Sequence, residues 1–251
     1  MDTSRWGLPV RRVEGDPEAA PLAPDAWPMT VPAVAQLVGD GLDLGPATVL
    51  VGENGTGKST LVEAVAEAFG LNPEGGSTGA QHTTRRSESP LGRALRVRRG
   101  LGGSRWGFFL RAEAMHGFFS YLEDPERGAD DPRAPHSGDP VFHEMSHGEA
   151  FNALLGTSRY RGPGFYCFDE PESALSFSSQ LALVAQLADL VATGTAQVLV
   201  ATHSPLLAAL PGARVLLVDD DGLTDVPWDA LPLVAHWRAF MDDPRRYLRH
   251  L

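Results

Sequence analysis

Residues Gly52-Glu53-Asn54-Gly55-Thr56-Gly57-Lys58-Ser59 form a glycine-rich segment that ends in a lysine and a serine. The apolar run 47–51 precedes this segment, and apolar residues at helical spacing follow it at positions 61, 62, 65 and 69. This pattern predicts a buried strand, a tight turn and a helix in immediate succession. The segment fits the pattern G-x-x-x-x-G-K-[ST], and it lies in the strand-to-helix position that this pattern requires. A glycine-rich turn that contains a lysine by chance is the alternative interpretation.

The chemistry of a phosphate-binding loop explains each residue type in the segment. Glycines let backbone N–H groups turn inward around phosphate oxygens, and the helix N-terminus adds its positive dipole. We expect Lys58 to reach the β- and γ-phosphates and Ser59 to bind Mg²⁺. The predicted nucleotide-binding residues of this loop are Gly52, Glu53, Asn54, Gly55, Thr56, Gly57, Lys58, Ser59 and Thr60.

Lys58 is also the single lysine among the 21 basic residues of the chain. The other basic residues are arginines, whose wide planar guanidinium does not easily replace a compact ammonium on a flexible stem. The composition therefore sets this position apart from the other basic positions.

A second apolar run, 165–168, ends in two carboxylates, Asp169 and Glu170. A parallel strand delivers the residues at its carboxyl end to the edge of the sheet where ligands bind. We expect Asp169 to hold Mg²⁺ and Glu170 to polarise the water that attacks the γ-phosphate. An ordinary acidic strand end is the alternative, because carboxylates commonly follow apolar strands.

The rest of the chain alternates predicted strands with predicted helices, which indicates an α/β fold with a mostly parallel sheet and a small helical subdomain. Strands are expected at 105–111, 164–168, 197–201 and 214–218, and a helix at 178–191. Residues 1–46 look irregular, with an edge strand at most, and residues 70–104 look like a surface excursion. We interpret residues 1–251 as one domain, with a lead-in at about 1–27 and a helical and loop insertion at about 112–150.

Composition excludes several classes of protein. The chain has 251 residues and a net charge of −11, so a role in coating DNA is not expected. A single cysteine, Cys167, excludes an internal disulfide, and the N-terminus lacks the apolar core of a signal peptide. No apolar run has the length of a membrane span. These features indicate the cytoplasm, and a transporter subunit would need separate membrane partners.

Three further segments follow in a fixed order. Residues 145–150 (MSHGEA) look like a degenerate ABC signature, 171–175 (PESAL) like a D-loop, and 202–204 (THS) like a switch-histidine loop. With the phosphate loop and the acidic strand, their order and spacing resemble those of the stand-alone bacterial ABC-type "AAA domain" predicted ATPases, which are P-loop NTPases. The ending 242–250 (DDPRRYLRH) adds to the resemblance, which covers residues from about 28 to the end.

The resemblance implies ATP and Mg²⁺ as cofactors and an ATP-dependent head-to-tail homodimer. Each ATP would lie between the phosphate loop of one copy and Ser146 and Gly148 of the other, while His203 would bond the γ-phosphate. Dimer closure would act as a switch that is coupled to an unknown protein partner. In this sequence Glu113 or Arg111 occupies the expected Q-loop place, and Trp27 is the candidate for stacking on adenine.

Two alternatives in other classes remain. A non-hydrolysing nucleotide-sensing module would carry the same loop. In addition, His143-Glu144-Met145-Ser146-His147 fits H-E-x-x-H, the zinc metalloprotease signature, which requires both histidines on one face of one helix. Against a zinc site, Ser146 and Glu149 form a capping box that would begin a helix between the two histidines.

Eight arginines lie between positions 85 and 111. Such a segment could make weak nucleic-acid contact. The alternative is a solvated insertion whose arginines pair with the excess carboxylates of the same chain. The arginines are at positions 85, 86, 93, 96, 98, 99, 105 and 111.

Overall fold

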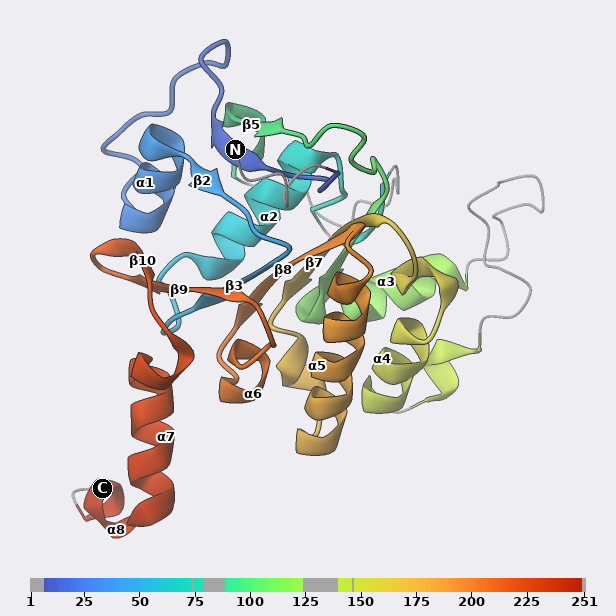
Figure 1. The fold of residues 1–251 in the computed structure, drawn as a ribbon, viewed down its shortest axis with the longest axis vertical. Coiled ribbons are helices and arrows are strands. Elements are labelled where there is room, and N and C mark those ends of the chain that lie inside the picture. Colours follow the sequence, from blue (N-terminus) through green and yellow to red (C-terminus); the bar gives the residue numbers. More distant parts are fainter. Residues whose placement is uncertain (1–6, 74, 79–88, 124–139, 146, 250–251) are drawn as a thin grey trace.

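The computed structural model describes residues 7–73, 75–78, 89–123, 140–145 and 147–249. Its centre is a seven-stranded sheet in the order β10-β9-β3-β8-β7-β6-β4 (Figure 1). The five inner strands are parallel, and the two edge strands run antiparallel to their neighbours. The expected α/β fold with a mostly parallel sheet is therefore confirmed.

The inner strands are β3 (Ala47–Val51), β6 (Gly107–Arg111), β7 (Gly164–Asp169), β8 (Ala196–Thr202) and β9 (Arg214–Asp219). The edge strands are β4 (Gly76–Ser77) and β10 (Gly222–Asp225). Every residue of β3, β7 and β8 is buried. Continuous burial is typical of parallel strands with helices on both faces, and it explains why these segments read as unbroken apolar runs.

Helices α1 (Pro32–Asp40) and α2 (Lys58–Phe69) cover one face of the sheet. Their apolar side chains share a core with the buried residues on that face of the central strands, including Leu50, Cys167 and Leu199. Buried Cys167 is part of this packing, and burial raises the pKa of its thiol. Helix α1 was not expected from the sequence.

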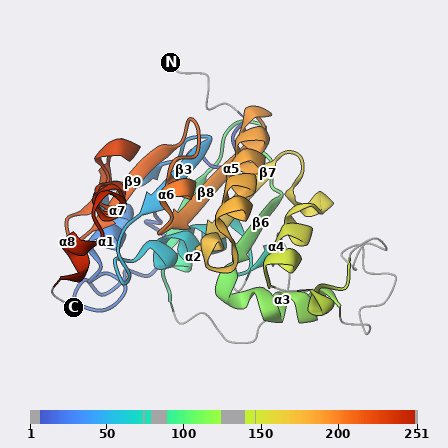
Figure 2. The ribbon, with the colours of Figure 1, turned by 90° about the horizontal axis from the view of Figure 1, so that it is seen from below.

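The other face carries α3 (Met115–Leu122), α4 (His147–Leu155), α5 (Phe177–Ala192) and α6 (Pro205–Ala208), with α5 and α6 over the central strands (Figures 1 and 2). Aromatic residues of β6 and β7 pack against α3 and α4 in one continuous core. Phe108, for example, contacts Phe118 edge-on at 5.4 Å between ring centroids. Short 3₁₀ turns complete the chain at 92–94, 112–114, 142–144, 158–160, 171–174 and 228–230.

A second, antiparallel sheet corrects the expectation for the N-terminal part. Its order is β2-β1-β5, formed by Leu42–Asp43, Arg12–Gly15 and Leu95–Arg98. Strand β1 is thus the central strand of a sheet rather than an edge strand in an irregular lead-in, and part of the expected surface excursion at 70–104 pairs with it. Buried Gln197 in β8 fixes this layer to the main sheet, since its side chain bonds both backbone groups of Val10 and the carbonyl of Gly45.

The described chain ends in α7 (Pro232–Asp242) and α8 (Arg245–Leu248), which project from the body in Figure 1 and form what we call the C-terminal arm (232–248). In Figure 2 α7 is seen nearly end-on at the edge of the molecule. Val234 is the buried residue of α7, and none of α8 is buried. The base of the arm therefore belongs to the core, and the rest lies outside it.

Candidate functional site

The predicted site residues follow strands that end together at one edge of the main sheet. The register pairs Val51 of β3 with Thr202 of β8, and Asp169 of β7 with Ala201 of β8. Strand β8 lies between β3 and β7, so His203 emerges between the phosphate loop and the acidic pair Asp169-Glu170. This order of strands was not predicted from the sequence.

The glycines of the loop are needed for geometric reasons. A Cβ on Gly52 would lie 2.1 Å from the carbonyl oxygen of Val218, so only glycine fits where the loop leaves β3 beside β9. Gly57 has φ +99°, and it caps the N-terminus of α2 in a left-handed conformation that favours glycine. The Thr56 hydroxyl donates to the carbonyl of Glu53 at 3.0 Å and closes the turn.

Lys58 begins α2 and is buried, with 3% of its surface exposed. Its ammonium donates to the carbonyl of Glu53 at 2.8 Å and therefore folds back across the loop. Burial lowers the pKa of Lys58, whereas the nearby carboxylates of Glu170, Asp169 and Glu172 raise it. A buried ammonium facing several carboxylates is well placed to bind an anionic group that enters between them.

Asp169 ends β7 and is 5% exposed. Burial raises its pKa to about 6, although a hydrogen bond from Ser59 and the charge of Arg111 act against this shift. The Arg111 Nε atom lies 3.6 Å from one carboxylate oxygen, Oδ2. The other oxygen, Oδ1, is buried and has no hydrogen-bond partner among the described residues. A buried carboxylate oxygen that lacks a partner, beside a serine hydroxyl, has the chemistry of a cation ligand.

Glu170 has φ 48° and ψ 48°, the one described non-glycine residue with a positive φ. Its backbone N–H donates to the carbonyl of Ala201, which holds the chain against β8 as it leaves β7. The strained conformation turns the carboxylate toward His203, whose Nε2 lies 3.0 Å from Glu170 Oε1. Strain of this kind is often found at functional positions.

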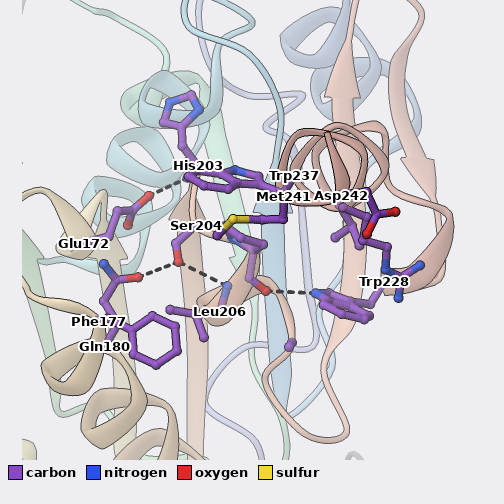
Figure 3. A pocket seen from close by; sticks show the side chains of 14 residues that line it. Glu172, Phe177, Gln180, His203, Ser204, Leu206, Trp228, Trp237, Met241 and Asp242 are labelled. Atoms are coloured by element: carbon purple, nitrogen blue, oxygen red, sulfur yellow. Dashed lines mark hydrogen bonds between the residues drawn. The ribbon is translucent and has the colours of Figure 1, made fainter. Parts of the chain in front are cut away.

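A hydrogen-bond network that sequence reasoning missed holds His203 in place (Figure 3). One carboxylate oxygen of Glu172 accepts from the Thr202 hydroxyl at 2.7 Å and from the backbone N–H of His203. The Ser204 hydroxyl donates to Gln180 at 2.6 Å and caps the N-terminus of α6. The Ser-Pro pair at 204–205 signals this helix start, but no local pattern could have predicted Glu172 or Gln180 as partners.

The predicted signature residues are only partly described. Ser146 lies outside the described residues. Gly148 is in the first turn of α4, and a Cβ added there would lie 3.2 Å from the carbonyl oxygen of Ala174. The start of this helix therefore lies beside the turn that follows Glu170.

The backbone geometry contradicts the zinc-protease alternative. His143 and Glu144 lie in a 3₁₀ turn, Met145 is extended (φ −104°, ψ 155°), and His147 begins a separate helix. His143 also bonds Ser120 through its ring and Glu123 through its backbone N–H. The two histidines thus do not share a helical face, and the described residues contain no group of three His, Cys, Asp or Glu side chains suited to a metal.

The two candidates for the Q-loop place lie differently. Arg111 bonds Glu63 at 2.8 Å and lies beside Asp169, whereas the side chain of Glu113 is 84% exposed. Trp27, the adenine-stacking candidate, is 53% exposed. It lies a few residues before Val31, the residue that a Cβ on Gly57 would contact. The segment that carries Trp27 thus passes close to the phosphate loop.

The arginine segment pairs largely with the chain itself. Arg96 and Arg98 both bond Glu14, Arg93 lies 3.7 Å from Glu67, and Arg99 bonds the carbonyl of Phe69 while covering its ring. Arg85 and Arg86 lie outside the described residues. The described contacts favour the interpretation of a segment that neutralises the carboxylates of the same chain.

Two curated proteins are similar to this chain in sequence. The chain is 25% identical over 184 residues to an "Uncharacterized ABC transporter ATP-binding protein" of Haemophilus influenzae, with 68% of each chain covered. It is 30% identical over 191 residues to the "Aliphatic sulfonates import ATP-binding protein SsuB 3" of Rhodococcus jostii, a match that covers 72% of this chain and 66% of that one. The chain belongs to the ABC-type P-loop ATPases. The match to the Rhodococcus protein spans about two thirds of that protein's length.

A family model described as "AAA domain, putative AbiEii toxin, Type IV TA system" matches residues 136–209 of this ABC-type ATPase. Among solved structures, similar chains include a putative metal-chelate type ABC transporter in an inward-facing conformation, with 16% identity and a TM-score of 0.46. That match covers 80% of this chain and 82% of the other. The SMC head domain from Thermotoga maritima matches with 15% identity and a TM-score of 0.39, over 74% and 93% of the two chains. In the described part of this ABC-type ATPase, no helix is both long and apolar enough to cross a bilayer.

Proposed function

We propose that this chain binds ATP with Mg²⁺ and hydrolyses it. One observation carries the proposal: Lys58, Asp169, Glu170 and His203 come from three separate strand ends and meet at one edge of the sheet. Phosphoryl transfer needs an ammonium for the phosphates, a carboxylate for the metal and a group that orients water. Lys58 offers the ammonium, Asp169 the carboxylate for the metal, and Glu170 with His203 the groups that orient water.

Binding would rest on the loop 52–60 and on Lys58. The bond from Lys58 to the Glu53 carbonyl is one that phosphate oxygens could replace, because charged acceptors bind ammonium groups more strongly than a carbonyl does. Asp169 and Ser59 fit a magnesium ion, since the buried Oδ1 atom has no other described partner. Mg²⁺, when bound with the nucleotide, offsets the negative charge of the phosphate oxygens.

Hydrolysis would rest on Glu170 and His203. The Glu170 carboxylate would hold the attacking water and accept its proton. His203 bonds the same carboxylate through its ring, and Glu172 accepts the backbone N–H of His203. The imidazole is therefore already ordered before it bonds a phosphate oxygen. Because Glu170 is held by both its backbone and its side chain, little reorganisation would precede the reaction.

We further propose that two copies close around the nucleotide, with Ser146 and Gly148 of each copy completing the site of the other. A serine hydroxyl and a backbone N–H near a helix start could bond a γ-phosphate. Closing and opening would transmit the energy of hydrolysis to an unknown protein partner in the cytoplasm, where ATP is supplied. The packing of α3 and α4 against the sheet in a single core supports one domain across the chain.

Phosphate release and nucleotide binding, measured together, test the proposal. Glu170→Gln should keep ATP affinity and lower phosphate release at least 100-fold, because an amide cannot accept the proton of the water. Lys58→Ala should lose both binding and release. Lys58→Arg, which keeps the charge, should also bind poorly, because the guanidinium is too wide for the buried loop.

Glu144→Gln is the matched control, since it makes the same chemical change at an exposed position outside the site. It should retain normal activity. If wild-type protein binds ATP but releases no phosphate with Mg²⁺ present, the chain is a nucleotide-sensing module instead. If Glu170→Gln hydrolyses ATP normally, the assignment of the base is wrong.

A further inference from the structure

A groove of about 840 Å³ lies between α5, α6 and the C-terminal arm (Figure 3). Phe177 and Gln180 of α5 form one wall, and Trp237 and Met241 of α7 form the other. Ser204 and Leu206 lie between the two walls in Figure 3. We call this cavity the arm groove. Its size and its mostly apolar, aromatic lining are typical of a binding site.

Both walls expose large apolar side chains. Phe177 is 65% exposed on α5 and Met241 is 70% exposed on α7, while Leu181 and Trp237 are each nearly half exposed. A helix of the length of α7 is only marginally stable by itself in water, and Val234 is its buried residue. An apolar helix face that the body covers so little indicates a binding surface.

The polar groups of the arm groove favour a cationic occupant. Glu172 lines it, and its Oε2 atom is buried without a hydrogen-bond partner among the described residues. Asp242 adds a second carboxylate at the other wall. The positive group in the lining, Arg238, lies over the Trp228 ring at 5.2 Å. The groove therefore suits a segment that combines apolar side chains with arginine or lysine.

The tip of the arm has this chemistry. Residues 245–249 read Arg-Arg-Tyr-Leu-Arg, all of them exposed, with Leu248 at 52% and Tyr247 at 37%. The tip lies at the far end of α7 from the body in Figure 1. It is fixed there by Tyr247, which bonds His236 at 3.1 Å and contacts the Phe240 ring. It therefore points away from its own groove and is free to enter the groove of another molecule.

We propose that the arm tip of one copy docks into the arm groove of a second copy, and that the exchange is reciprocal. Each contact pairs basic and apolar residues of the tip with carboxylates and aromatic residues of the groove. A two-fold arrangement uses the contact twice and closes the assembly as a dimer. The exchange adds a second contact between the two copies of the proposed homodimer, separate from closure around the nucleotide. His203 and Glu172 line the groove, but no residue of the phosphate loop does, so the exchange requires no nucleotide.

A complementation experiment between two variants tests the exchange. Both carry Lys58→Ala, so that ATP-driven closure cannot contribute. The groove variant adds Phe177→Ser, and the tip variant adds Arg245→Glu and Arg246→Glu. Association is measured without nucleotide by sedimentation equilibrium. The parent should dimerise, and each variant alone should bind itself at least tenfold more weakly.

Mixing the two variants should restore one of the two contacts, because the intact tip of the first meets the intact groove of the second. The mixture should therefore associate more strongly than either variant alone and more weakly than the parent. The control Leu101→Ser removes an apolar side chain that is 84% exposed elsewhere, and it should leave the dimer unchanged. A monomeric parent, or variants that dimerise like the parent, would overturn the proposal. A mixture that fails to associate would also overturn the proposal. That result is expected if the arms pair with each other and not with the grooves.

Thermal melting of each variant establishes that it is folded. Should Phe177→Ser unfold the protein, Met241→Ser at the opposite wall replaces it as the groove variant. If wild-type protein does not hydrolyse ATP, the proposed function is wrong. The outcome of the association assay is unaffected, because that assay contains no nucleotide.

Discussion

Glu170, the proposed catalytic base, has a left-handed backbone conformation. Its φ of 48° lies where a side chain costs roughly 1–2 kcal/mol relative to glycine. In this conformation its carboxylate lies 3.0 Å from Nε2 of His203. The strained backbone thus serves to position the carboxylate.

Comparing Glu170→Gly with Glu170→Ala measures that strain, because both variants lose the carboxylate. The glycine variant should be more stable by about 1 kcal/mol, since it adopts the left-handed conformation freely. In a helix the alanine variant would instead be the more stable of the two. Urea denaturation of both proteins gives the difference, and an equal or more stable alanine variant would show that the backbone relaxes.

Gly52→Ala should impair both folding and nucleotide binding. The new Cβ would lie 2.1 Å from the carbonyl oxygen of Val218, so the start of the loop or β9 must move. We expect a loss of about 1–3 kcal/mol in the free energy of unfolding and at least tenfold weaker ATP binding. Gly55→Ala is a useful comparison, because the position has open space although its φ is +83°. A normal Gly52→Ala protein would contradict the close approach.

At this scale the sequence was informative about the loop residues and about Asp169, Glu170 and His203, which the structure brings together. Their roles stay predictions. The hydrogen bonds around His203 could not be predicted, because they join elements that meet only in the folded sheet. Glu172, in the turn after β7, bonds His203, and Gln180 of α5 bonds the neighbouring Ser204. Periodicity describes a segment and its own neighbours, not contacts across the fold.

Elements differ in how well the sequence predicted them. The long, fully buried strands β3, β7 and β8 were expected almost to the residue. The small sheet was missed, although Leu95 and Val97 alternate with Arg96 and Arg98 as a strand should. Four residues are too few for alternation to stand out among so many arginines and glycines. Only the pairing with β1 identifies the segment as a strand.

Glu14 should stabilise this small sheet in a pH-dependent way. Burial raises the pKa of its carboxyl, but hydrogen bonds from Arg96, Arg98 and Arg12 dominate and lower it from 4.5 to about 2. A depressed pKa means that the stabilisation is fully present above about pH 5 and is lost as the pH falls toward 2. Wild type and Glu14→Gln should therefore differ more in urea midpoint at pH 7 than at pH 3. A constant difference would show that the carboxylate charge is unimportant.

Gln197→Leu should separate the N-terminal layer from the main sheet. The change leaves the N–H and carbonyl of Val10 and the carbonyl of Gly45 without their buried partner. Buried backbone groups left unpaired should cost about 2–4 kcal/mol in total. Thermal denaturation measures the loss. Thr48→Val, which removes one buried hydrogen bond, from the N–H of Gly45, is the comparison, and an equal effect would mean that the number of lost hydrogen bonds does not matter.

At the scale of the whole molecule, nucleotide binding should raise the melting temperature. Saturation at 100 times the Kd adds about 2.7 kcal/mol, or roughly 5–10 °C for a chain of this size. Wild-type protein with ATP and Mg²⁺ should show this shift, and Lys58→Ala should show none. A shift in Lys58→Ala similar to that of wild type would place nucleotide binding elsewhere in the molecule.

The overall architecture followed from the sequence, because alternating strands and helices leave few arrangements for a parallel sheet. The strand order and the projecting arm did not, because both depend on tertiary packing. The arm consists of helical segments whose apolar residues look like any core-facing stripe. The sequence does not reveal that Trp237 and Met241 are exposed, because their exposure depends on how the arm packs on the body.

The central position of β8 implies that some parts of the molecule unfold locally far more easily than others. All seven of its residues are buried, and it is paired on both sides, by β3 and β7. Its amide hydrogens should therefore exchange with solvent only when the entire domain unfolds, whereas those of α8 should exchange almost at once. His203 is the first residue after this most protected strand. The residue expected to sense the γ-phosphate is thus attached to the part of the molecule that opens last.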